Sequence, residues 1–214
     1  MASIVSLSRV HGLLSDPGSA GVTAIDKRPI DGSVKVGEYG LYGDVQVDRK
    51  HHGGPTKAVY AYAIEDAEHW SSLLGREVTD GLFGENLRTR GLDVSGAVIG
   101  ERWLLGAQVV LEVTSPRTPC ATFGRRMGER GWVRRFAAEG RPGAYLRVVT
   151  EGEVCAGDEI RVIDRPEHGV TITSWFSTRR AADAAALLAH HESGRHPLVP
   201  EMLESIGTAI SSNR

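Results

Sequence analysis

Short apolar and β-branched runs, separated by glycine turns, make up the chain from residue 1 to about residue 165. Four of these runs read SIVSLSRV, DVQVD, AVYAYA and QVVLEVT. Runs of this kind fit antiparallel strands, because glycine adopts the turn conformations that tight connections need. Two longer stretches are predicted hairpins, RWLLGAQVVLEV around Gly106 and GAYLRVVTEGEVCAGDEIRVI around Glu151 and Gly152. We therefore expect a mainly β fold, an antiparallel sheet or barrel, in residues 1–165.

The strand pattern is interrupted after residue 120. The stretch ATFGRRMGERGWVRRFAAEG spaces Phe123, Met127 and Val133 roughly as they would lie on one face of a helix. Its glycines weaken a helix, because glycine loses more backbone freedom on folding than other residues. The stretch therefore predicts a broken helix between strand-rich parts of the β domain.

The composition changes again near DRPEHG, residues 164–169. After it, STRRAADAAALLAHHESG offers Ser177 or Thr178 as a helix N-cap and Gly194 as a stop signal. A second helical stretch, PLVPEMLESIGTAI, follows two proline breaks. We therefore divide the chain into a β domain of residues 1–165 and a helical extension of residues 166–214, which is too short to hold much core alone.

Composition and charge exclude several classes of protein. The chain has 214 residues, of which 41% are hydrophobic and 24% charged, as expected for a globular protein with a sizeable core. A net charge of -2 gives no overall attraction to a nucleic acid polymer or an anionic membrane. Neither a secretory signal nor a stretch as long as a membrane span is evident, so a cytoplasmic protein is expected. Two cysteines fit neither a disulfide framework nor a cluster held by four cysteines.

One of the two cysteines stands in a distinctive place, at the end of TSPRTPC. Thr118 is a candidate N-cap and Pro119 suits the first helical position, which would put Cys120 in the first turn of a helix. Backbone N–H groups and the helix dipole there stabilise a thiolate, which can attack an electrophile or bind a soft metal. Nearby cations would add to this effect. They are Arg117, Arg125 and Arg126. A small buried residue at a strand–helix junction is the structural alternative.

The other cysteine, Cys155, lies in GEVCAGDEI. Its acidic neighbours disfavour a thiolate, because a nearby negative charge raises the pKa of a thiol. We interpret Cys155 as structural.

A glycine- and histidine-rich cluster precedes these motifs, in GLYGDVQVDRKHHGGPTKAV. Gly53 and Gly54 allow the backbone to approach a ligand and to expose N–H groups to an anion. Three basic residues bring positive charge to the same segment. They are Arg49, Lys50 and Lys57. His51 and His52 could bind a proton, an anion or a metal, and a structural role before a glycine turn is the alternative.

Two smaller motifs are compatible with the same site. FGENL sets Glu85 and Asn86 either in a turn or in a buried hydrogen-bonding role. TAIDKRPI places Lys27 and Arg28 before a proline, where they are solvated unless an anion site lies nearby. The sequence contains neither a phosphate-binding Walker loop nor a dinucleotide-binding fingerprint.

Five segments together resemble the MOSC domain family, in the order in which they occur. They are TAIDKRPI, GLYGDVQVDRKHHGGP, FGENL, TSPRTPC and GAYLRVVTEGEVCAGDEI. Each motif is weak alone, but the combination is specific, and it is strongest from Lys27 to Ile160. Within the family the chain resembles the bacterial YiiM-like subgroup, which carries a three-helix extension after the β domain. The resemblance implies a MOSC-type β-barrel followed by a small helical subdomain.

The resemblance also implies a cofactor, the molybdenum cofactor, in which a phosphate-bearing pterin dithiolene (molybdopterin) holds the metal. The cysteine of the family's PRxPC motif is the expected molybdenum ligand, here Cys120, and a soft thiolate suits that metal. His52 is the implied acid or base near the metal. The other implied contacts to the pterin or phosphate come from several motifs. They are Lys27, Arg49, His52, Gly53, Gly54, Asn86, Thr114, Arg117 and Arg147.

For YiiM-like proteins the resemblance implies an oxidoreductase that converts N-hydroxylated compounds, such as hydroxylaminopurines, into amines. The reaction would be oxygen-atom transfer at the cysteine-ligated molybdenum. Electrons would come from an external flavin- or iron–sulfur-containing reductase, since nothing in the sequence resembles a flavin, nicotinamide or cluster site. The helical extension could cap the pocket, bind that partner or support a homodimer.

Two alternatives stay open. The first is a sulfur carrier with a persulfide on Cys120, used for sulfuration of the cofactor. The second is a module that binds or stores the molybdenum cofactor without catalysis. The family's association with pyridoxal phosphate belongs to a further domain, for which these 214 residues leave no room.

Overall fold

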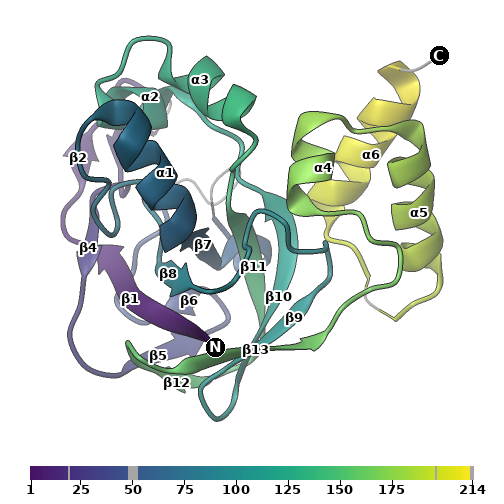
Figure 1. The fold of residues 1–214 in the computed structure, drawn as a ribbon, viewed down its shortest axis with the longest axis horizontal. Coiled ribbons are helices and arrows are strands. Elements are labelled where there is room, and N and C mark those ends of the chain that lie inside the picture. The colour runs from purple at the N-terminus through teal and green to yellow at the C-terminus, as the bar shows by residue number, and fades with distance from the viewer. Residues whose placement is uncertain (19, 48–52, 196, 213–214) are drawn as a thin grey trace.

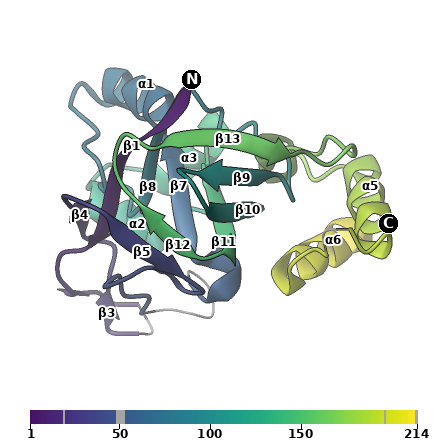
Figure 2. The ribbon, with the colours of Figure 1, turned by 90° about the horizontal axis from the view of Figure 1, so that it is seen from below.

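A computed structural model describes residues 1–214 except 19, 48–52, 196 and 213–214. Within the described residues, seven strands close into a barrel in the order β13-β9-β10-β11-β7-β8-β1, because β13 also pairs with β1 (Figures 1 and 2). These barrel strands are β1 (Ala2–Val10), β7 (Val59–Ala63), β8 (Leu87–Arg90), β9 (Arg102–Leu105), β10 (Val109–Pro116), β11 (Ala144–Thr150) and β13 (Glu159–Asp164). The pairings in the barrel are antiparallel except β7 with β8, which is parallel. The predicted β-barrel is confirmed.

Shorter strands extend the barrel at its rim. β4 (Lys27–Pro29) pairs with the end of β1, and β12 (Gly152–Val154), β5 (Val34–Gly37) and β6 (Gly40–Leu41) form a small sheet. β2 (Leu14–Ser15) and β3 (Val22–Thr23) form a separate hairpin. A short 3₁₀ helix, η1 (Pro55–Lys57), leads into β7.

One of the two predicted hairpins is correct. β9 and β10 pair directly across a turn at Gly106, which has a positive φ of 56°. The second prediction is wrong, because β11 pairs with β10 and β7, β12 pairs with β5, and β13 pairs with β9 and β1. Alternating apolar residues identify a strand but do not choose its partner, and closure of the barrel sends these three strands to different neighbours.

Strand β7 separates two hydrophobic clusters, because all five of its residues are buried. Val59, Ala61 and Ala63 point into the barrel core, whereas Tyr60 and Tyr62 join an aromatic cluster outside it. Successive side chains of a strand face opposite sides, so the small-large alternation of VYAYA fits a narrow barrel interior and a roomier outer layer.

Three helices cover the aromatic cluster: α1 (Ile64–Leu74), α2 (Ala121–Met127) and α3 (Trp132–Glu139). The predicted broken helix is confirmed, since α2 ends at Gly128 and α3 begins after Gly131, both with positive φ. The predicted face is correct for Phe123 but wrong for Val133, which is 38% exposed. Trp132 is buried in its place, because the glycine break changes the phase of the second helix relative to the first.

Helices α4 (Ile172–Ser177), α5 (Ala181–Glu192) and α6 (Pro200–Ser212) follow β13 and lie to one side of the barrel (Figure 1). The expected N-cap of α5 is wrong, because Ser177 and Thr178 end α4 and Arg180 is the residue before α5. A capping box formed by Thr171 and Ser174 starts α4 as a separate helix. None of the helices in the described part of the chain has the length and apolar character of a membrane span.

The extension shares its hydrophobic core with the barrel. Trp175, Leu187, Met202 and Ile206 belong to the same buried cluster as the barrel interior. The short helices therefore gain their burial from the β domain, as their length requires. The domain boundary at residue 165 stays a prediction; it falls one residue after the end of β13 at Asp164.

Candidate functional site

A cavity of about 470 Å³ opens at one end of the barrel, beside the start of α2. The β2–β3 hairpin and the strand β4 border one side, and residues 45–47, 83–86 and 117–125 border the others. Six of the residues singled out in the sequence line it together: Lys27, Lys57, Asn86, Arg117, Cys120 and Arg125. The fold therefore brings motifs that lie 93 positions apart into one pocket (from Lys27 to Cys120).

Cys120 is the residue immediately before α2 and its side chain is partly exposed. Its carbonyl accepts the first helical hydrogen bond, from the N–H of Gly124 at 3.0 Å. The predicted N-cap at Thr118 is wrong by two positions, because the prolines keep the chain extended until Cys120 itself. The sulfur thus borders the cavity from the helix entrance and also packs against the aromatic cluster.

Arg117 lies beside Cys120 in the pocket wall and is only 4% exposed. Its guanidinium carbon lies 3.5 Å from the ring centre of Phe123 and 5.4 Å from that of Tyr60. These ring faces attract the cation, but they provide no hydrogen-bond acceptor in the ring plane. Among the described residues, its buried Nη1 has no hydrogen-bond partner. A buried cation in this state provides an unused donor to an anionic ligand in the pocket.

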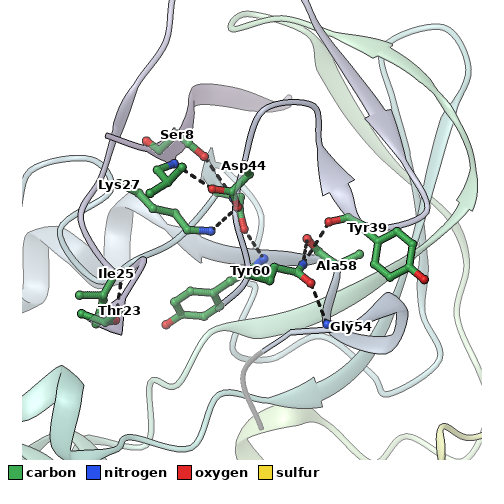
Figure 3. A network of polar contacts seen from close by, with 12 residues as sticks. Ser8, Thr23, Ile25, Lys27, Tyr39, Asp44, Gly54, Ala58 and Tyr60 are labelled. Carbon is green, nitrogen blue, oxygen red and sulfur yellow. Dashed lines mark hydrogen bonds and ion pairs between the residues drawn. The ribbon is translucent and has the colours of Figure 1, made fainter. Parts of the chain in front are cut away.

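A buried carboxylate organises the opposite wall. Asp44 Oδ2 accepts a hydrogen bond from Lys27 Nζ at 2.6 Å (Figure 3), and a second from Asn86 Nδ2 at 2.8 Å. Its Oδ1 accepts from the backbone N–H of Val10 at 2.8 Å. Asn86 Oδ1 in turn accepts from the N–H of Tyr60 at 3.2 Å. The two pocket-lining side chains are therefore fixed in orientation by one residue, and Asp44 neutralises the charge of Lys27.

Sequence reasoning missed Asp44. In GLYGDVQVD it is an ordinary acidic residue after a glycine, and only the fold brings it to Lys27 and Asn86. The neighbouring Glu85 has a separate task, since its carboxylate accepts hydrogen bonds from the N–H groups of Gly81 and Phe83. A turn stabilised by Asn86, one of the two roles considered for FGENL, is therefore wrong: the turn is stabilised by Glu85, and both side chains make buried hydrogen bonds.

Two of the three arginines expected to help Cys120 are neutralised by carboxylates. Arg125 donates two hydrogen bonds to Asp16, at 2.9 and 2.7 Å, and Arg126 pairs with Asp26 at 2.7 Å. The hydrogen bonds from Arg125 hold the pKa of the Asp16 carboxyl below its usual value. Asp16 therefore stays ionised, and it ties the β2–β3 hairpin to the helix that begins after Cys120.

Gly53 and Gly54, expected to expose N–H groups to an anion, are not among the residues that line the cavity, and the N–H of Gly54 has a partner within the fold. Gly54 has a φ of 85°, and its N–H donates to Gln46 Oε1 at 2.7 Å (Figure 3). A Cβ on Gly53 would lie 2.9 Å from the Gln46 side chain, so both glycines are required by packing. Lys57, at the end of η1, lines the cavity. Five residues of this segment, 48–52, lie outside the described residues, and they include the predicted site residues Arg49, Lys50, His51 and His52.

Two of the expected pocket contacts lie elsewhere. Thr114 is buried, and its hydroxyl lies 2.7 Å from the carbonyl oxygen of Thr56 and 3.0 Å from that of Tyr145. Arg147 pairs with Glu112 at 2.7 Å, away from the cavity. Thr114 is close to Cys120 in sequence, but it belongs to β10, where its hydroxyl joins strands instead of facing a ligand.

The prediction for Cys155 is confirmed by its hydrogen bond. Its thiol donates to Asp158 Oδ1 at 3.3 Å, and this interaction raises the pKa of the thiol. The thiolate is therefore disfavoured at Cys155.

In the parts of the chain that the structure describes, no three His, Cys, Asp or Glu side chains gather as a metal-binding group. Cys120 is therefore a single sulfur donor at the wall of a pocket. A metal bound there would need further donors from its own cofactor, and a dithiolene supplies such donors.

Comparisons with known proteins agree with this arrangement. The family model described as "MOSC domain" matches residues 48–161. The chain is 35% identical over 150 residues to the uncharacterized protein YflK of Bacillus subtilis, covering 70% of this chain and 67% of YflK. It is 30% identical over 148 residues to the protein YiiM of Escherichia coli, covering 67% of this chain and 65% of YiiM.

Two further matches differ in extent. A protein of Gibberella moniliformis named "Reductase" is 33% identical over 147 residues, which cover 67% of this chain but only 26% of that protein. The crystal structure of YiiM from Geobacillus stearothermophilus superposes with a TM-score of 0.77 at 25% identity, covering 98% of this chain and 99% of that one. The structural match thus includes the helical extension.

Proposed function

Since this chain belongs to the MOSC domain family, we propose that it is a molybdenum-cofactor-dependent reductase of N-hydroxylated compounds such as hydroxylaminopurines. Molybdenum cofactor binding is a property of the family, and reductases occur among its members. The substrate, the dependence on molybdenum and the electron donor are parts of the proposal. The carrying observation is that Cys120 and Arg117 line the same cavity, and that the buried Nη1 of Arg117 has no hydrogen-bond partner in the described part of the chain.

The residues of the pocket fit the cofactor. Cys120 would be the protein ligand of the metal, because a soft thiolate matches the sulfur environment of a dithiolene. Arg117 would donate its unused N–H groups to an anionic part of the cofactor, and Lys27 and Asn86 would line the opposite wall. When bound, the molybdenum would supply a centre that accepts an oxygen atom in a two-electron step.

The residues of the chain itself would bind and orient the cofactor and would exclude water from it. The rings of Phe123 and Tyr60 keep solvent from one side of Arg117, so its interaction with an anion is stronger than in water. Tyr60 donates its hydroxyl proton to the carbonyl of Pro142 at 2.9 Å, and burial holds the pKa of Tyr60 well above its usual value. Tyr60 therefore forms a neutral wall and is not the proton donor. His52 remains our candidate for that role.

The test is the molybdenum content of protein made in a cofactor-competent host, measured with reduction of an N-hydroxylated purine in the presence of a flavin- or iron–sulfur-containing reductase. Wild-type protein and Cys155→Ala should bind molybdenum and turn over. Cys120→Ala should lose both properties while its thermal unfolding stays close to that of the wild type. Full activity of Cys120→Ala at normal metal content would refute the proposal.

Two other outcomes would replace it. Molybdenum bound tightly without turnover would indicate a storage module. A persulfide on Cys120, found by mass spectrometry in molybdenum-free protein, would indicate a sulfur carrier.

A further inference from the structure

The helical extension reaches the wall of the cavity through one side chain. Glu201, in the first turn of α6, accepts a hydrogen bond at Oε1 from the hydroxyl of Thr56 at 2.8 Å. The same oxygen lies 3.9 Å from Nζ of Lys57, whose side chain is only 12% exposed and lines the cavity. A residue 144 positions later in the chain therefore contacts the segment that borders the pocket (201 against 57).

The contact holds η1 from a second side. The carbonyl of Thr56 accepts a hydrogen bond from the hydroxyl of Thr114 on β10, at 2.7 Å. The backbone of Thr56 is thus fixed by the barrel and its side chain by α6. Lys57 is the next residue after Thr56. These two contacts therefore fix the backbone position from which the Lys57 side chain extends toward the cavity.

Glu201 lies on a helix, α6, that is packed firmly against the barrel. Met202 and Ile206 are 2% and 1% exposed and anchor α6 in the same hydrophobic cluster as the barrel interior. Glu201 Oε2 is buried, and no described residue hydrogen-bonds to it. Because the Glu201 side chain as a whole is 35% exposed, its contacts contribute little to the stability of the fold, and their main effect is on the position of the Thr56 side chain and the charge beside Lys57.

We propose that Glu201 is a positioning residue for Lys57, and that the helical extension completes the binding site of the cofactor from behind. This role rests on the proposed function, because it assumes that the cavity receives the molybdenum cofactor. Glu201 acts through Thr56 and Lys57 and does not itself line the cavity.

The experiment compares Glu201→Ala, Glu201→Gln and Glu204→Gln. The first removes both contacts, and the second keeps a hydrogen-bond acceptor for Thr56 but removes the charge near Lys57. The third is the matched control, since Glu204 is exposed one turn later on the same helix. Two quantities are measured besides unfolding temperature: molybdenum per chain after gel filtration, and the rate at which Lys57 of the cofactor-free protein is acetylated by N-hydroxysuccinimide acetate, followed by mass spectrometry.

For Glu201→Ala we expect roughly five- to tenfold faster acetylation of Lys57 and a molybdenum content lower by a similar factor, as for the loss of one hydrogen bond and one weak ion pair. The unfolding temperature should stay close to that of the wild type, which a general loss of structure would not produce. Glu201→Gln should lie between Glu201→Ala and wild type, and it serves alone if Glu201→Ala does not fold. Glu204→Gln should match wild type in both measurements.

Wild-type acetylation and wild-type molybdenum content in the Glu201 variants would overturn the positioning role while leaving the proposed function intact. A wild-type protein that takes up no molybdenum would overturn the proposed function, and the role of Glu201 toward the cofactor with it. The two failures are therefore distinguishable in the same set of samples.

Discussion

Replacement of Arg117 by methionine should stabilise the cofactor-free protein and abolish cofactor binding. Arg117 is 4% exposed and its Nη1 lacks a hydrogen-bond partner among the described residues, so the folded state includes a desolvated donor. Such a donor costs about 1–3 kcal/mol. The nearby rings of Phe123 and Tyr60 return about 1–2 kcal/mol through cation–π attraction. Methionine fills much of the same space and removes the unpaired charge at the wall of the cavity.

We therefore expect Arg117→Met to raise the free energy of unfolding of the cofactor-free protein by about 1 kcal/mol. For a chain of this size, that corresponds to a rise of about 2–4 °C in Tm. The assay is thermal unfolding by circular dichroism on cofactor-free protein, with molybdenum content measured on protein from a competent host. Arg125→Met is the matched control, because Arg125 lines the same cavity but is paired with Asp16. Its pair is solvent-exposed, so the control should be slightly less stable than wild type instead of gaining stability.

Two results would refute this reasoning. A cofactor-free Arg117→Met protein less stable than wild type by 1 kcal/mol or more would show that the guanidinium is satisfied in the fold. Normal molybdenum content in that variant would show that the cofactor does not use the free donor.

Two further predictions concern buried polar groups. Asp44→Asn should lower the free energy of unfolding by about 3 kcal/mol, because it leaves the ammonium of Lys27 without its counter-charge. In urea titrations, a second change, Lys27→Met, should restore most of that loss. No recovery of stability in the double variant would contradict the pairing. Burial, and then the neighbouring His190, lower the pKa of His168, whose ring accepts from the N–H of Val170 and lies 3.0 Å from the carbonyl of Ile99. The neutral ring therefore contributes stability that is present above the ordinary pKa of about 6.5 and is lost as the pH falls through the lower folded-state pKa. His168→Gln should flatten the stability profile between about pH 7 and pH 5, and an unchanged slope would assign the pH dependence to other groups.

The sequence allowed prediction of the features that depend on local pattern. The β-rich barrel, the glycine-broken helix and the helices after β13 follow from alternation, from glycine positions and from alanine-rich composition. The disfavoured thiolate of Cys155 also follows, since its acidic neighbours decide it, whereas the role of Cys120 stays a prediction. The wrong predictions concern partners, such as the second hairpin around Glu151 and Gly152, because strand pairing is chosen by the whole barrel.

The same distinction applies to the site. The motif around Cys120 and the basic residue Lys27 could be identified, but Asp44 carries no local signal that sets it apart from other acidic residues. Thr114 illustrates the opposite error, because closeness in sequence suggested a pocket contact that the direction of a strand side chain prevents. Charge counts were also insufficient, since Arg125 and Arg126 have carboxylate partners that the sequence places 109 and 100 positions away.

The position of the cavity follows from the two hydrophobic clusters. The barrel core and the aromatic cluster lie on opposite faces of β7 and β11, and Tyr60 and Tyr145, which line the cavity, belong to the aromatic face. Ala61 and Ala144 on the same strands belong to the barrel core, which continues into the extension. A change in the extension can therefore reach the cavity through the barrel packing as well as through Glu201. Faster acetylation of Lys57 without a change in unfolding temperature would therefore report the Glu201 route, whereas a fall in unfolding temperature would report the shared core.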